Sequence, residues 1–181
     1  MAEDVLTEQY GITEEELDSI ISKPDKLIEG ETGTRNLLLN VLEKMGCGKS
    51  INFDSISFDD DGTCAFSFSC MEESFYASAT NDRVFAEIVK CCHDCPLDDK
   101  EEITIVKKAI NKVNENKIAK MYYSIDKEYN LFYVECCLCF LLIPLIPNIE
   151  QYIYSQLIFI NRAEQYFDSI LESEKGKEEK R

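Results

Sequence analysis

Two kinds of hydrophobic spacing follow one another along this chain, and their order restricts the folds open to it. Apolar residues three or four positions apart are typical of an amphipathic helix, whereas apolar residues at every second position are typical of a half-buried strand. From residue 34 onward the order is helix, three strands, helix, two strands and helix. The predicted helices cover residues 34–45, 98–117 and 148–172, and the predicted strands cover residues 64–70, 74–80, 84–92, 120–125 and 131–142.

This order predicts an α+β fold in which an antiparallel sheet packs against helices, because neighbouring strands usually pair through short turns. The clearest strand has Cys64, Phe66 and Phe68 on one face and small residues on the other. Residues 131–142 are apolar on both faces apart from Glu135. We therefore expect this strand to lie centrally in the sheet or at a contact between subunits.

Residues 1–33 precede the predicted domain and carry one further predicted helix. Thr13 and Glu16 form a capping box at its start, and a short apolar stripe follows. A linker rich in Gly and charged residues then leads to the domain, which we expect to span residues 34–172. The last residues, 173–181, are highly charged and are predicted to form a disordered tail.

The chain is strongly acidic, since its 35 Asp and Glu against 19 Lys and Arg give a formal net charge of −16. Such a charge repels phosphate backbones and anionic lipid head groups, and it attracts basic segments. We therefore expect neither nucleic-acid nor membrane binding. The most apolar stretch, residues 131–147, contains Glu135 and two prolines, and a membrane-spanning helix needs about 20 apolar residues.

The nine cysteines are expected to be reduced. Their number is odd, and Cys91–Cys92 and Cys136–Cys137 are sequence neighbours that cannot bridge each other comfortably. The N-terminus has neither the basic start nor the apolar run of a secretory signal. Together these features predict a cytoplasmic location.

The sequence shows no catalytic constellation, so we expect a non-enzymatic protein without a cofactor. Residues 48–50 (GKS) look like the end of a phosphate-binding loop, but Glu43 stands where the loop needs its first glycine, and the segment leaves a helix. The acidic turn at residues 59–62 lacks the ligand spacing of an EF-hand. His93 is the only histidine, and no nucleophile motif accompanies it.

Thiols supply the one alternative chemistry. Cys92 and Cys95 form a CxxC pair beside Cys91, and Cys137 and Cys139 lie two positions apart in a predicted strand. Four thiols from the two segments could bind zinc if the connection after the third strand lay over the fifth strand. The spacing does not match zinc ribbons or fingers, and cysteines in an apolar strand behave as small hydrophobic residues. A metal-binding or thiol-based regulatory protein using these five cysteines is therefore the alternative hypothesis.

Two segments carry a resemblance to a known family. They read KKAINKVNENKIAKMYYSIDKEYNLFYVECCLCFLL and NIEQYIYSQLIFINRAEQYFDSIL, and they place a helix, an Asn-rich turn, a hairpin and a long amphipathic helix in sequence. Together with the strands at 64–69 and 72–79, they resemble the YbjN-like family, which shares the fold of type III secretion chaperones. The resemblance covers residues 34–172. It implies a small, acidic protein of the bacterial cytoplasm that dimerises and holds other polypeptides without nucleotide, in a chaperone-like or regulatory role.

We therefore expect a homodimer that binds an unidentified protein or peptide. The final helix and the strand at residues 131–142 are the expected contact surfaces. On the final helix, Tyr154 and Ile158 are large apolar residues on an otherwise polar face, so they are the predicted partner-binding residues. Packing at the edge of the core would also explain both of them.

Overall fold

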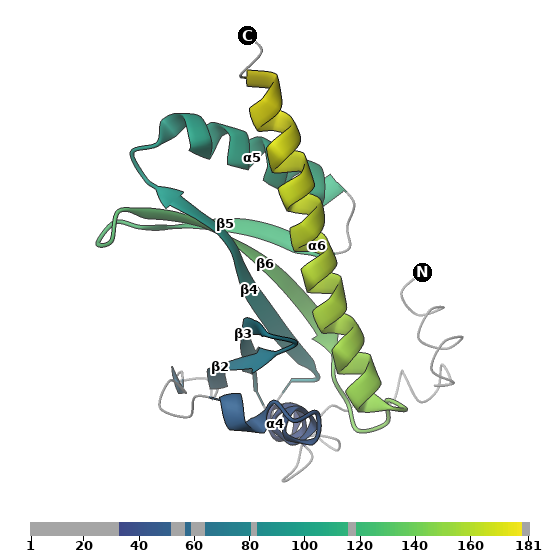
Figure 1. Cartoon of the computed structure of the whole chain (residues 1–181). Coiled ribbons are helices and arrows are strands. Elements are labelled where there is room, and N and C mark those ends of the chain that lie inside the picture. The colour runs from purple at the N-terminus through teal and green to yellow at the C-terminus, as the bar shows by residue number, and fades with distance from the viewer. Residues whose placement is uncertain (1–32, 52–56, 59–63, 81–82, 116–118, 179–181) are drawn as a thin grey trace. The chain divides into compact units, whose positions relative to one another are not determined.

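The computed structural model describes residues 33–51, 57–58, 64–80, 83–115 and 119–178 (Figure 1). They form helices and a six-stranded sheet with the strand order β1-β2-β3-β4-β6-β5. The described residues divide into two compact units. Unit 1 holds those up to Glu87 together with Cys139–Tyr154, and unit 2 holds Ile88–Leu138 and the residues from Ser155 onward. Three elements contribute to both units, namely β4 (Phe85–Pro96), β6 (Leu131–Leu141) and α6 (Ile149–Glu178).

Unit 1 is built on two strands whose side chains alternate between a buried and an outward face. β1 pairs antiparallel with β2, and β2 pairs antiparallel with β3. On β2 and β3 the rings of Phe66, Phe68 and Phe75 are fully buried, and those of Phe68 and Phe75 stack with centroids 5.5 Å apart. The alternation predicted for these strands is therefore confirmed. The elements that lie in unit 1 alone are α4 (Thr34–Lys44), η2 (Gly48–Ser50), β1 (Ser57–Phe58), β2 (Cys64–Cys70) and β3 (Glu73–Ala79).

Helix α4 covers the buried face of unit 1. Its apolar side chains Leu38, Val41 and Leu42 are at most 1% exposed, as the helical spacing predicts. The helix starts at Thr34, whose buried hydroxyl donates a hydrogen bond to the carbonyl of Arg83 just before β4. This bond ties the helix start to the chain that enters the sheet.

The end of α4 is fixed by a glycine. Gly46 has φ +81°, a left-handed conformation that costs a side-chain-bearing residue free energy. Its N–H bonds to the carbonyl of Glu43 at 3.0 Å, and the N–H of Cys47 bonds to the carbonyl of Leu42 at 2.9 Å. These two bonds are the Schellman pattern, which satisfies the last carbonyls of the helix.

Unit 2 packs two helices on one face of its strands. Asp99 caps α5 (Lys100–Glu115) by accepting a hydrogen bond from the N–H of Glu102 at 2.9 Å. The apolar face of α5 is buried as predicted, except that Ile105 is buried while Ile103 is half-buried. Lys107 of α5 lies 4.7 Å from the ring centre of Tyr123, which places α5 beside β5 (Lys120–Asp126).

Strand β6 lies between β4 and β5 in the sheet, so the prediction of a central position is confirmed. It pairs antiparallel with β5 in a register that sets Met121 opposite Cys136 and Ile125 opposite Phe132. Phe132, Val134 and Cys136 are fully buried. The predicted α+β class is also confirmed, and the predicted order of elements matches apart from the short helix η2 and the two-residue strand β1.

Two predicted boundaries are wrong. β4 continues to Pro96 instead of ending at residue 92, so the CxxC pair lies on a strand. α6 continues to Glu178, so residues 173–178 are helical where a disordered tail was predicted. Ion pairs from Glu174 to Lys112 at 2.6 Å and from Lys175 to Glu102 at 2.7 Å hold this last part of α6 to α5. The predicted N-terminal helix and the acidic turn at 59–62 lie outside the described residues.

The glycine at the end of α4 makes a stability test possible. We expect Gly46→Ala to lower the free energy of unfolding by about 1 kcal/mol, because alanine is strained at positive φ. Gly176→Ala is the matched control: this glycine is helical, and an added methyl group would meet no atom within 4 Å. Alanine there should raise the free energy of unfolding by up to ~1 kcal/mol. Urea denaturation measures both, and equal signs would contradict the assigned conformation of Gly46.

Candidate functional site

The outward face of the unit 1 sheet carries two exposed aromatic rings. Tyr76 on β3 is 58% exposed, and Phe85 at the start of β4 is 54% exposed. The hydroxyl of Ser78 donates to the Glu87 carboxylate at 3.3 Å, so the outward side chains of β3 and β4 share one face. Tyr76 and Phe85 stand two positions before Ser78 and Glu87, so strand alternation places both rings on this same face.

The strand beside Tyr76 offers only small side chains to this face. In the β2–β3 register, Ser67 is opposite Tyr76 and Ala65 is opposite Ser78. Small neighbours leave the sides of a large ring accessible, and the exposure of both rings shows that no described helix covers them. On its β2 side, the ring of Tyr76 therefore has only small neighbours.

A hollow of about 220 Å³ adjoins Phe85 on this face. Its wall includes Ser78, the ring of Phe85 and the side chain of Cys139, and Arg83 and Glu87 bring opposite charges to it. Small-molecule sites usually enclose about 300–1,000 Å³. The size and the mixed walls of this hollow suit a single side chain of a bound polypeptide better than a cofactor.

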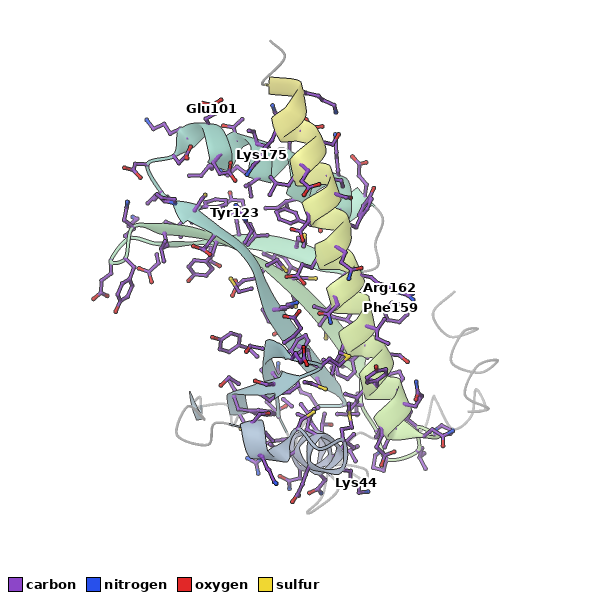
Figure 2. All side chains as sticks on the ribbon, viewed as in Figure 1. Lys44, Glu101, Tyr123, Phe159, Arg162 and Lys175 are labelled. Atoms are coloured by element: carbon purple, nitrogen blue, oxygen red, sulfur yellow. The ribbon has the colours of Figure 1, made fainter. Side chains whose placement is uncertain are left out.

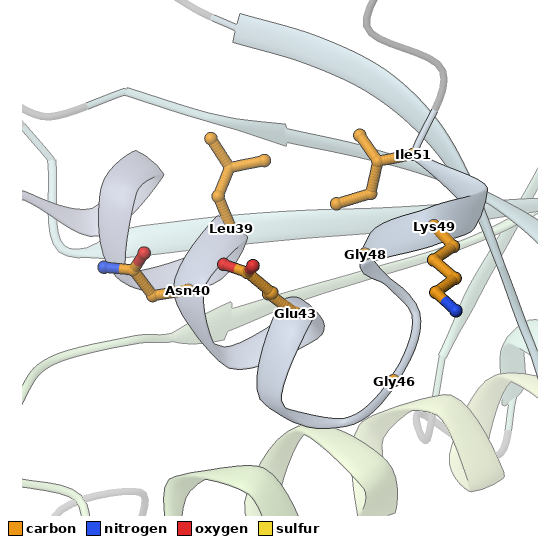
Figure 3. A pocket seen from close by; sticks show the side chains of 7 residues that line it. All are labelled: Leu39, Asn40, Glu43, Gly46, Gly48, Lys49 and Ile51. Carbon is orange, nitrogen blue, oxygen red and sulfur yellow. The ribbon is translucent and has the colours of Figure 1, made fainter.

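A second hollow, of about 500 Å³, lies between α4 and η2 (Figure 3). It includes Gly48 and Lys49 of the GKS sequence. The Ser50 hydroxyl donates to the Cys47 carbonyl at 2.6 Å and accepts a hydrogen bond from the N–H of Ser69 at 2.8 Å. This serine therefore joins η2 to β2. A phosphate-binding loop instead opens a helix, whereas η2 follows the end of one.

The four cysteines considered as metal ligands lie on two strands. Cys92 and Cys95 lie on β4, and Cys137 and Cys139 lie on β6. Zinc binding would require the CxxC pair to lie in a connection over the fifth strand, but β4 continues to Pro96, so the pair lies on the strand itself. Among the described residues, no group of three or more His, Cys, Asp or Glu side chains could hold a metal ion.

The surroundings of these thiols disfavour their charged forms. Burial raises the pKa of Cys95, and the carboxylates of Glu102 and Asp99 raise it further. Burial likewise raises the pKa of Cys139, with a smaller contribution from Glu87. A raised pKa keeps a thiol protonated at neutral pH and lowers its reactivity as a nucleophile.

One thiol contact was missed by sequence reasoning. Cys92 and Cys136 interact through a side-chain hydrogen bond between neighbouring strands, which raises the pKa of Cys92 and lowers that of Cys136. The Cys92 thiol also lies 3.4 Å from the carbonyl of Lys90. Strand periodicity could place Cys136 on the buried face, but it could not reveal which cysteine lay across from it.

The predicted partner-binding residues occupy different environments on α6. Tyr154, in unit 1, is 39% exposed, whereas Ile158, in unit 2, is half-buried. Phe159 and Tyr166 are also exposed on the unit 2 part of the helix, and Figure 2 labels Phe159. The same helical spacing argument, applied to every aromatic residue of α6, would have found these two.

A buried ion pair holds α6 to the sheet of unit 2. Lys90 is only 4% exposed, and its ammonium group bonds to the carboxylate of Glu164 and, at 3.1 Å, to the side-chain oxygen of Asn161. A buried ammonium group is tolerated only when it is paired. The helix face of β4 is thus defined by a charged residue as well as by apolar ones.

Solved structures that are similar to this chain include the following two. An uncharacterized protein from Methanothermobacter thermautotrophicus matches with a TM-score of 0.50 and 9% sequence identity, over 77% of this chain and 97% of that chain. This similarity shows a shared fold. YbjN from E. coli, the namesake of the family that the sequence resembles, matches with a TM-score of 0.45 and 12% identity, over 83% of this chain and 95% of that chain. No family model matches the sequence, and no curated protein is significantly similar to it.

None of the described helices combines the length and the apolar character that a membrane-spanning helix needs.

The buried pair predicts a large effect of a single substitution. We expect Lys90→Ala to lower the free energy of unfolding by about 3 kcal/mol, because the partly buried Glu164 carboxylate loses its partner. The double variant Lys90→Met with Glu164→Met should recover much of this loss, since no unpaired charge remains. Lys127→Ala, at an exposed turn position, is the control and should change stability by less than about 0.5 kcal/mol. Thermal and urea denaturation measure these changes. An equally small loss of stability in Lys90→Ala and in the control would contradict the pairing.

Proposed function

We propose that this chain is a non-enzymatic module that binds an extended basic polypeptide segment, in a chaperone-like or regulatory role, and acts as a homodimer. The observation that carries the proposal is the outward face of the unit 1 sheet, where Tyr76 and Phe85 are more than half exposed and the β2 neighbour of Tyr76 is the small Ser67. Large aromatic residues are enriched at the energetic centres of protein interfaces. Two such rings on an uncovered sheet face are a suitable anchor for a polypeptide.

The geometry of the hollow beside Phe85 supports the same partner class. Its volume of about 220 Å³ suits one side chain, and the ring of Phe85 supplies an apolar wall. An extended segment presents a side chain to one face at every second residue. One of these side chains would occupy the hollow while another contacts Tyr76.

Charge supports a basic segment. Glu87 lies on the same face as the rings, and the chain carries a formal net charge of −16. A field of this sign accelerates the approach of Lys- and Arg-rich segments and disfavours acidic ones. The net charge therefore selects among partners, while the aromatic rings supply the contact area.

The cysteines support a cytoplasmic location. All nine are free thiols, including exposed Cys91 and Cys139. Exposed thiols persist in a reducing environment, so we place the protein in the cytoplasm. Tyr154 and Ile158 of α6 stay a prediction as partner-binding residues.

The charge preference is tested with two synthetic peptides that share the same alternating apolar residues. One carries lysine and the other glutamate at the intervening positions. We expect the lysine peptide to bind at least about tenfold more tightly in fluorescence anisotropy, which corresponds to about 1.4 kcal/mol. Its affinity should fall as the ionic strength rises, because salt screens exposed charges. Equal binding of the two peptides would refute a basic partner.

The aromatic face is tested with Tyr76→Thr combined with Phe85→Thr, since threonine keeps a high strand propensity. We expect this variant to bind the lysine peptide at least about tenfold more weakly, because hot-spot aromatic residues contribute about 2 kcal/mol each. Tyr129→Thr removes an equally large and more exposed ring (70%) from unit 2 and should bind like the wild type. If the two variants weakened binding alike, this face would not be the binding site.

A further inference from the structure

Strand β5 ends the sheet, because among the described strands only β6 lies next to it. One position of its outer edge is occupied by a side chain. Asn114 donates to the carbonyl of Met121 at 2.9 Å and accepts from the N–H of Met121 at 2.8 Å. The amide of Asn114 thus bonds both backbone groups of one residue, as a neighbouring strand would.

These bonds reveal which backbone groups of β5 point outward. Since the N–H and C=O of Met121 bond to Asn114, they point away from β6. In an antiparallel ladder, residues alternate between pairs that exchange hydrogen bonds and pairs that do not. Tyr123 and Ile125, two and four positions further, therefore also direct their N–H and C=O groups to the outer edge. No hydrogen bond between described residues uses these four groups.

The side chains of the same two residues are exposed and apolar. Tyr123 is 46% exposed, although one side of its ring stacks on Phe132 at 5.0 Å, and Ile125 is 47% exposed (Figure 2 labels Tyr123). Aromatic and β-branched residues form favourable cross-strand pairs. The outer edge of β5 thus offers two open backbone positions with a matching apolar surface.

We propose that β5 of one copy pairs antiparallel with β5 of a second copy, with Tyr123 opposite Ile125 of the second copy and Ile125 opposite its Tyr123. A two-fold axis then passes beside Ser124. Every outward N–H and C=O of Tyr123 and Ile125 finds a partner in this register, in two reciprocal pairs of hydrogen bonds. The two open positions of one copy therefore pair fully with the same two positions of the other.

Asn114 selects this register over its neighbours. Pairing Ile125 with Met121 of the second copy would require the backbone of Met121 to leave the amide of Asn114. A shift in the other direction would run into the turn that follows Asp126. The edge therefore has one favourable pairing instead of a sliding series, which is how a blocked position limits uncontrolled strand addition.

Charge also favours a second copy in this orientation. Lys120 stands at one end of β5, and Asp126 and Glu128 outnumber Lys127 at the other. An antiparallel partner brings the basic end of each strand to the acidic end of the other. Two copies of net charge −16 repel each other over longer distances. We therefore expect the dimer to strengthen as ionic strength rises, because salt screens the overall repulsion more than the close contacts.

The inference develops the homodimer of the proposed function, and its test separates the two. The unit 1 face and the β5 edge share no residue. If a monomeric variant still binds the lysine peptide, the proposed peptide site stands. If the protein is a dimer but does not bind the peptide, only the proposed peptide site is contradicted.

Sedimentation equilibrium of the full chain tests the contact. We expect the wild type to have twice the mass of one chain and Ile125→Pro to have the mass of one, because proline removes an outward N–H and leaves the β5–β6 bonds intact. Ile125→Val keeps the N–H and the branched side chain and should remain a dimer. Three results would overturn the proposal. The first is a wild type that is monomeric at about 100 µM, a concentration at which even a micromolar dimer would form. The others are a folded Ile125→Pro variant that is dimeric, and a Tyr154→Lys variant on α6 that is monomeric.

A cross-link fixes the register even if Ile125→Pro does not fold. Residues beside the two-fold axis face each other at a Cα separation of about 4.5 Å, within reach of a disulfide. Ser124→Cys should therefore give two copies of the chain joined by a disulfide at position 124, seen by mass spectrometry after mild oxidation. Tyr122→Cys is the matched control on the same face, because its two copies would lie about 13 Å apart along the strands. Failure of Ser124→Cys to link, or equal linking by both variants, overturns the register.

Discussion

One buried charge and its hydrogen-bond partners fix how α6 packs on β4 in unit 2. The ammonium group of Lys90 stands in the middle of β4 on the face that the helices cover, and it bonds to Glu164 and Asn161 of α6. A buried charge without partners would cost several kcal/mol, so the helix and the strand are held in one relative position. The pair also leaves the other face of β4 outward, where Cys91 is exposed.

Strand alternation has the corresponding role in unit 1. Because successive side chains point to opposite faces, burying Phe66, Phe68 and Phe75 forces Ser67 and Tyr76 outward. The hydrophobic effect thus produces the core and, as a direct consequence, the composition of the uncovered face. Most positions of that face are small or polar, which suits solvent. Tyr76 and Phe85 instead expose large aromatic rings to solvent, and such exposed apolar surface makes the face a candidate binding surface.

Two features of the chain limit uncontrolled association at the exposed edge of β5. A free edge strand is a template for uncontrolled strand addition. Here the amide of Asn114 occupies one position of that edge, and a net charge of −16 keeps copies apart unless a contact is well matched. The cysteines are similarly restrained, since burial and nearby carboxylates raise the pKa of thiols such as Cys95 and keep them protonated. These features favour defined contacts over aggregation and over thiol chemistry.

The sequence by itself determined the order of the elements, the buried faces of α4, β2 and β3, and the central position of β6, because periodicity is a local property that follows from how each element meets a core. It did not determine the ends of β4 and α6. The CxxC segment carries no clear alternation, and residues 173–178 are helical where ion pairs to α5 hold them. Only the tertiary structure decided that Cys92 meets Cys136, that Asn114 bonds the edge of β5, and that Tyr76 and Phe85 share an uncovered face. Each of these depends on which strands become neighbours, and strand pairing joins residues whose separation along the chain leaves no local signal.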